Sequence, residues 1–171
     1  MIRVVVNSTP LIALSLTGHL SILRAHFEQV VVPVSVYEEV VLRGKGRPGA
    51  SEVEKADWIV VKEPLGKPSL PPALLGLGPG ELDTILLAQE LKADWVLMDD
   101  KLGRKVAHAL GLRVKGTLGV LLTAYQTGLL TREMAEKAID TLSKSPVWVS
   151  PRLVDWFKTQ LTLKTQEASG E

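Results

Sequence analysis

The chain has 171 residues, of which 46% are hydrophobic and 23% are charged, with a formal net charge of +1 and no cysteine. This length and composition suit one globular domain with a sizeable core and argue against disorder. The composition excludes disulfides, thiolate metal sites and a basic field over the whole molecule, and without a bilayer-length apolar run or a secretory leader we expect a cytoplasmic protein without membrane contact.

The first half of the chain alternates short apolar runs with helix-like segments. A β-branched run over residues 3–6 predicts a buried strand, and the Ser-Thr-Pro sequence over 8–10 then favours a helix start. Apolar residues continue the helical pattern to residue 23, with Gly18 marking a break between two short helices. The pattern further predicts a strand over 29–32, a helix over 34–42, a glycine-rich loop over 44–49, a helix over 50–56 and a strand over 58–61.

The second half continues this alternation. Residues 63–72 are rich in proline and glycine and are expected to wrap the surface, before a Gly-Pro-Gly sequence over 78–80 that introduces a helix. The predicted elements are a helix over 81–91, a strand over 95–98, a helix over 101–110, a strand over 112–114 and helices over 118–127, 132–143 and 150–161. Short apolar strands alternating with helices predict an α/β fold, a three-layer α/β/α sandwich with a mostly parallel central sheet. We expect one domain over 1–163 and a polar, frayed tail over 164–171.

The strand over 95–98 leads into two adjacent carboxylates, Asp99 and Asp100. Ligands of open parallel sheets bind outside the carboxyl ends of the strands, so this pair is placed to hold a metal ion or to do acid–base chemistry. Two full charges 4 Å apart repel by roughly 4 kcal/mol at an effective dielectric constant of 20, and a bound cation or a raised pKa would relieve that repulsion. The structural alternative is that one Asp caps the following helix while the other faces water.

Other oxygen-bearing side chains lie where strands end or helices begin. Asn7 follows the first strand, Glu38 and Glu39 lie in the helix after the second, and Glu81 and Asp83 open a later helix. Together with the Asp pair they suit Mg²⁺ or Mn²⁺ rather than a soft metal, and such an ion could activate water at a scissile phosphate. The structural alternative is that acidic residues favour helix N-termini and that the adjacent glutamates form the exposed side of a helix.

Cationic side chains gather in two places. Arg43, Lys45 and Arg47 lie in the glycine-rich loop, and Lys101 follows the Asp pair. Such clusters either contact phosphates or form ordinary solvated surface. Other residues do not indicate a functional site. The three histidines lack metal-ligand spacing, Ser8 lacks a nucleophile-elbow context, and the four scattered tryptophans are expected to pack against other residues.

Six segments also carry a family resemblance: VVNSTPLIAL over 5–14, PVSVYEEV over 33–40, LGPGELD over 77–83, VLMDD over 96–100, VKGTLGVLL over 114–122 and WVSP over 148–151. In this order they resemble the PIN-domain family, in particular its DUF3368 branch of prokaryotic proteins. Each segment is weak alone, whereas the ordered set is specific and covers most of the chain. The resemblance implies a three-layer fold and a metal-dependent endoribonuclease on single-stranded or structured RNA, often the toxin of a toxin–antitoxin pair.

The resemblance also implies roles for individual residues, because PIN nucleases hold one or two Mg²⁺ or Mn²⁺ ions with a cluster of acidic residues. By position, Asn7 stands where the first-strand Asp usually sits, Glu39 matches the second acidic position with Glu38 beside it, Glu81 matches the third with Asp83 as the alternative, and Asp100 matches the fourth with Asp99 as helper or alternate. Arg43, Lys45, Arg47 and Lys101 are the candidate contacts to the RNA backbone.

Asn7 departs from the usual pattern of the family, although members of this branch often carry Asn there. Its side chain offers a metal a neutral carbonyl oxygen but no charge, which weakens divalent-cation binding. A catalytically impaired module that binds RNA or protein is therefore the second hypothesis beside the nuclease. A receiver-like phosphoryl-transfer domain is disfavoured, since it needs its acidic cluster at the first strand. We also expect an exposed apolar helix face to form a homodimer, and the resemblance implies an antitoxin partner.

Overall fold

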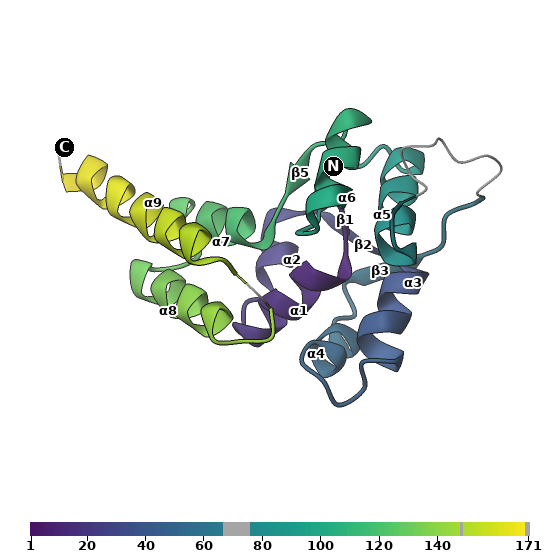
Figure 1. Ribbon diagram of the computed structural model, residues 1–171, viewed down its shortest axis with the longest axis horizontal. Helices are drawn as coiled ribbons and strands as arrows, with labels where there is room; N and C mark the ends of the chain where they lie inside the picture. The colour runs from purple at the N-terminus through teal and green to yellow at the C-terminus, as the bar shows by residue number, and fades with distance from the viewer. Residues whose placement is uncertain (67–75, 148, 170–171) are drawn as a thin grey trace.

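The computed structural model describes residues 1–66, 76–147 and 149–169 (Figure 1). Within these ranges five strands form one sheet in the order β3-β2-β1-β4-β5, and every neighbouring pair is parallel. The strands are β1 (Arg3–Val6), β2 (Gln29–Pro33), β3 (Ile59–Lys62), β4 (Trp95–Leu97) and β5 (Val114–Lys115). Helices cover the sheet, so the predicted three-layer α/β/α fold is confirmed.

The helices follow the predicted order with small shifts at their ends. They are α1 (Ser8–Leu16), α2 (Ile22–His26), α3 (Val34–Tyr37), η1 (Glu38–Leu42), α4 (Ala50–Lys55), α5 (Pro79–Glu90), α6 (Lys101–Ala109), α7 (Thr117–Gln126), α8 (Arg132–Ser143) and α9 (Pro151–Ser169). The break at Gly18 is confirmed, because this residue takes the left-handed φ of +76° between α1 and α2. The loop prediction for 63–72 falls partly on residues 67–75, outside the described residues.

Two elements differ from their predictions. Residues 38–42 form a π-helix that continues α3, where the pattern predicts one regular helix to residue 42. The last helix continues to Ser169, whereas the prediction ends it at residue 161. Residues 152–169 contain neither glycine nor proline, so no residue in this stretch terminates the helix.

The core occupies both faces of the sheet because successive strand residues point to opposite sides. Val4 and Val6 face the cluster that includes α1, α2, α7, α8 and α9, whereas Val5 faces the cluster that includes α5 and α6. α9 packs against α7 and α8 at one side of the molecule (Figure 1). No helix among the described residues has the length and apolar character needed to cross a membrane.

The sheet order places the candidate residues at one edge. β1 pairs with β2 on one side and with β4 on the other, and all three run in the same direction. Their carboxyl ends therefore lie together, and the crevice outside them is where ligands of such sheets bind. Asn7 follows β1 and Asp99 lies just beyond β4 at this edge.

Candidate active site

Asn7 is the most deeply buried of the candidate residues. Its side chain is 1% exposed, and its backbone N–H donates to Leu97 O at 2.9 Å, which fixes it beside the end of β4. Its Nδ2 donates to Glu81 Oε1 at 3.4 Å. Its Oδ1 is buried without a hydrogen-bond partner among the described residues. An acceptor left in this condition costs about 1–3 kcal/mol, so Asn7 Oδ1 is a strong candidate to receive a cation.

Gly80 leaves a space that Asn7 and Glu39 border. A methyl group placed on this glycine would lie 3.5 Å from Asn7 Oδ1 and 3.5 Å from Glu39 Oε2. Glu81, the next residue of α5, accepts the hydrogen bond from Asn7. The structure therefore brings Asn7, Glu39 and Glu81 together from three elements that are distant in sequence.

Glu39 is presented by the π-helix η1. The wider turn is closed by the N–H of Arg43, which donates to Glu38 O at 2.8 Å across five residues. Single π turns are frequent at functional sites, where the extra residue changes the direction of a side chain. Directly after η1, a methyl group on Gly44 would lie only 2.3 Å from Val40 O, so a residue without a side chain is needed there. The same tight turn carries the exposed cations Arg43, Lys45 and Arg47 close to Glu39 in sequence.

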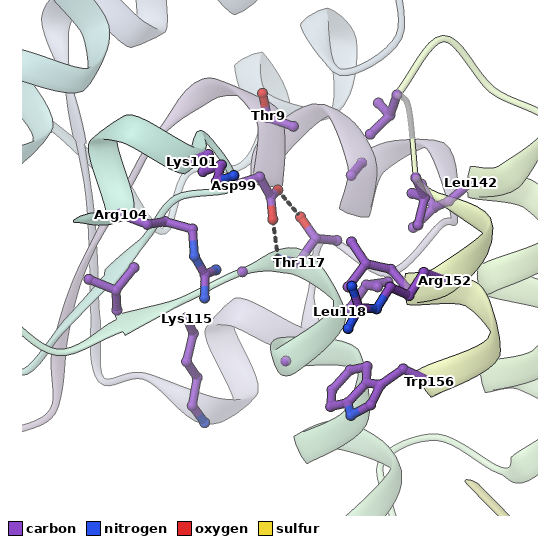
Figure 2. Close-up of a pocket in the computed structure, with 17 residues that line it drawn as sticks. Thr9, Asp99, Lys101, Arg104, Lys115, Thr117, Leu118, Leu142, Arg152 and Trp156 are labelled. Carbon is purple, nitrogen blue, oxygen red and sulfur yellow. Dashed lines mark hydrogen bonds between the residues drawn. The ribbon is translucent and has the colours of Figure 1, made fainter. Parts of the chain in front are cut away.

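Asp100 and Asp99 both hold helix starts. Asp100 is the N-cap of α6, where its Oδ2 accepts the N–H of Gly103 at 2.7 Å. Asp99 accepts the N–H of Thr117 at 2.8 Å and the hydroxyl of Thr117 at 2.5 Å, which joins the end of β4 to the start of α7 (Figure 2). The structural alternative, one Asp capping a helix and the other facing water, is thus confirmed for Asp100. It is wrong for Asp99, because this carboxylate is hydrogen-bonded to Thr117, 18 positions later in the chain. None of these contacts joins the Asp pair to Asn7, Glu39 or Glu81.

Two further candidate residues are Asp83 of α5 and Lys101 of α6. Asp83 is buried at 7% exposure within α5, while Glu81 contacts Asn7. Lys101 is exposed at the start of α6, beside the capping Asp100. Within the described residues no group of three or more His, Cys, Asp or Glu side chains has the arrangement of a metal site. The oxygen group at Gly80 contains an Asn and two Glu, so it offers one neutral and two anionic ligands.

A match between the sequence and a family model identifies the family. The PIN-domain model DUF3368 matches residues 3–162. The chain belongs to the PIN-domain family. A PilT N-terminus domain protein from the hyperthermophilic archaeon Sulfolobus solfataricus P2 is similar in fold, with a TM-score of 0.52 and 19% identity over 72% of this chain and 93% of that chain. No curated protein matches the sequence.

PIN domains are generally nucleases that act on nucleic acids, and they typically use divalent metal ions. The residues of this PIN domain fit such an ion in two respects. Hard cations prefer oxygen ligands, which Asn7, Glu39 and Glu81 supply. The unpartnered Asn7 Oδ1 and the missing side chain at Gly80 leave an acceptor and a space at the same point. The sequence pattern predicted Gly80 only as part of a helix start. No local pattern indicates that this glycine also leaves space beside Asn7 and Glu39.

Proposed function

We propose that this PIN domain is a divalent-metal-dependent endoribonuclease whose Mg²⁺ or Mn²⁺ ion is held by Asn7, Glu39 and Glu81. The observation that carries the proposal is the buried Asn7 Oδ1, which has no partner among the described residues and faces the same space as Glu39 Oε2. A divalent cation would satisfy that oxygen and neutralise the two glutamates. RNA rather than DNA follows from the family resemblance.

The chain's own residues have separate tasks in this proposal. Asn7 fixes a neutral oxygen at the carboxyl end of β1, and its Nδ2 holds Glu81 in place. Glu39 and Glu81 supply the negative charge that retains the ion. When bound, the ion supplies an activated water and neutralises charge at the scissile phosphate. Arg43, Lys45, Arg47 and Lys101 are exposed and contact phosphates of the RNA strand.

Asp100 enters the proposal as a fourth oxygen source. Its Oδ2 is used by the cap of α6, so only its Oδ1 is offered to a ligand. Asp99 is less suited, because both of its oxygens accept hydrogen bonds from Thr117. Asp99 therefore acts here by fixing the start of α7, and Asp83, buried in α5, is not needed for the ion.

Adjacent glutamates provide a matched test. Cleavage of a single-stranded RNA is measured with millimolar Mn²⁺ or Mg²⁺ for the wild type, Glu39→Gln and Glu38→Gln. We expect Glu39→Gln to slow cleavage by roughly tenfold or more, equivalent to about 1.4 kcal/mol of transition-state stabilisation, because one of two anionic ligands is lost. Glu38→Gln removes the same charge from the same turn and should stay within about twofold of the wild type. Equal rates for the two variants would contradict the proposed site.

A noncatalytic RNA-binding module is the second candidate function. Two observations favour it. Asn7 places an amide at the end of β1 where the family usually has a carboxylate, and both members of the Asp pair already accept hydrogen bonds, Asp100 from Gly103 and Asp99 from Thr117. RNA binding without cleavage at millimolar metal, together with no Mn²⁺ binding, would select this candidate. The toxin role and the antitoxin partner stay predictions from the resemblance, and the homodimer stays a prediction from an exposed apolar helix face.

A further inference from the structure

A pocket of about 800 Å³ lies on the α9 side of Asp99. Its lining residues come from α1, α6, β5, α7, α8 and α9 and from the segments that join them, and the hydrogen-bonded Asp99 and Thr117 form part of its wall (Figure 2). We call it the α9 pocket. Pockets of about 300–1,000 Å³ enclose ligands of nucleotide size. Since Asp99 precedes Asp100, the α9 pocket adjoins the carboxyl edge of the sheet that carries the candidate active site.

The α9 pocket is positively charged. Lys101, Arg104, Lys115 and Arg152 line it, and Asp99 is the one carboxylate among its lining residues, all of which are described. Asp99 accepts two hydrogen bonds from Thr117, and Arg104 Nη1 donates to Met98 O at 3.2 Å, so the Arg104 guanidinium keeps further N–H groups for a ligand. Arg104 lies on one side of Asp99 and Thr117, and Arg152 on the other (Figure 2). Such an arrangement favours an anionic group between the two guanidinium groups.

Lys115 is a partly buried cation of the pocket lining. Burial lowers the pKa of its ammonium, and the nearby Arg113 lowers it further. Its Nζ donates to Thr123 Oγ1 at 3.1 Å and lies 4.7 Å from the centre of the Trp95 ring. An anion entering the pocket would stabilise the charged form of this lysine.

The wall formed by α9 and α7 also carries apolar and aromatic side chains. Trp156 and Leu153 of α9 line the pocket although they are 43% and 47% exposed, and Leu118 of α7 is part of the same lining (Figure 2). Phe157, the next residue of α9, is fully buried, so the helix that carries Trp156 is anchored in the core. An accessible indole near Arg152, on an anchored helix, suits a ligand that combines a flat ring with a phosphate.

We propose that the α9 pocket binds a nucleotide of the RNA strand that runs past the active site, with its phosphate between Arg104 and Arg152 and its base against Trp156. The choice of RNA as ligand rests on the proposed function. The pocket adds a positioning subsite built by the C-terminal helix, about 50 residues after the Asp pair. It sets where the strand lies relative to Asn7, Glu39 and Glu81 without touching the reacting phosphate.

The test measures RNA binding without cleavage. A fluorescein-labelled single-stranded RNA of twelve nucleotides is titrated in EDTA with the wild type, Arg152→Ala and Trp156→Ala, each checked for folding by thermal unfolding. We expect Trp156→Ala to weaken binding by roughly five- to hundredfold through lost stacking. Arg152→Ala should weaken binding and reduce the slope of log Kd against log salt by about one. Leu163→Ala, an equally exposed apolar residue of α9 outside the pocket, and Arg24→Ala in α2 are the controls and should bind as the wild type does.

Two outcomes would overturn the inference. The first is wild-type RNA affinity in both pocket variants. The second is equal affinity for uridine or adenosine monophosphate and for the RNA, because the pocket would then serve a free nucleotide. Failure of the proposed nuclease has a different signature, since the wild type would leave RNA uncleaved with metal while the pocket variants still lose affinity in EDTA.

Discussion

Gly80 is the residue at which the proposed metal site is most easily blocked. Gly80→Ala places a methyl group 3.5 Å from both Asn7 Oδ1 and Glu39 Oε2 and 3.4 Å from Val36 Cγ2, which are ordinary contact distances. The variant should fold, and an Ala in α5 should stabilise it by roughly 0.5–1 kcal/mol. The methyl group occupies the ion's space, so Mn²⁺ affinity should fall at least tenfold by titration calorimetry.

The control for this variant is Gly119→Ala in α7, where the nearest atom to an added methyl group is Lys115 Cβ at 3.9 Å. It should gain similar helix stability and keep its Mn²⁺ affinity. Unchanged Mn²⁺ binding by Gly80→Ala would place the ion elsewhere.

For individual residues, the sequence predicts the position of a side chain that follows a strand better than it predicts the hydrogen-bond partner of that side chain. Asn7 could be placed at the sheet edge, because parallel strands end together. Glu39 and Glu81 were candidates from their positions, the family resemblance favoured them over Glu38 and Asp83, and the structure brings them to Asn7. The partner of Asp99 could not be predicted, since Thr117 reaches it only through the pairing of β4 with β5. The contact between Asp99 and Thr117 therefore depends on the tertiary fold, although the sequence alone singles out Asp99 as a candidate.

Among the elements, the π-helix η1 depends on the tight turn that follows it. Gly44→Ala would place a methyl group 2.3 Å from Val40 O and 3.0 Å from Glu39 O, so the backbone of η1 must move. We expect a loss of about 1–3 kcal/mol in the free energy of unfolding, as for other overpacked sites, measured by urea denaturation. Glu39 should shift with the turn, and RNA cleavage should fall as well.

The same Gly119→Ala variant serves as the control for the free energy of unfolding, because an added methyl group there meets no close atom. Wild-type stability and cleavage in Gly44→Ala would mean that η1 does not depend on this turn.

Hydrophobic periodicity explains which elements were predictable. α8 has the predicted bounds, since its buried face repeats regularly and Thr131 caps it by accepting the N–H of Met134. The π turn was not predictable, because Val40 and Val41 in η1 and Val36 in the preceding α3 are buried as they would be in one regular helix. Apolar spacing over so few residues does not separate the two geometries.

For the whole molecule, α9 decides whether the C-terminal part belongs to one cooperative unit. Phe157 and Leu161 are fully buried in the same cluster as β1 and α1, whereas Trp156 is 43% exposed. Sequence patterning could identify a helix here, but not which of two adjacent aromatic residues faces the core, because that depends on how α9 crosses α7 and α8.

The adjacent aromatic residues allow a direct test of this cooperativity. Phe157→Ala should lower the free energy of unfolding by about 3–5 kcal/mol, because it leaves a cavity in a fully buried position. Trp156→Ala, on the exposed side of the same turn, should cost about 1 kcal/mol or less. Urea unfolding followed by fluorescence and by circular dichroism should give coincident transitions for both variants. A separate early transition in Phe157→Ala would mean that α7, α8 and α9 unfold apart from the sheet, and the wall of the α9 pocket would then open without loss of the acidic site.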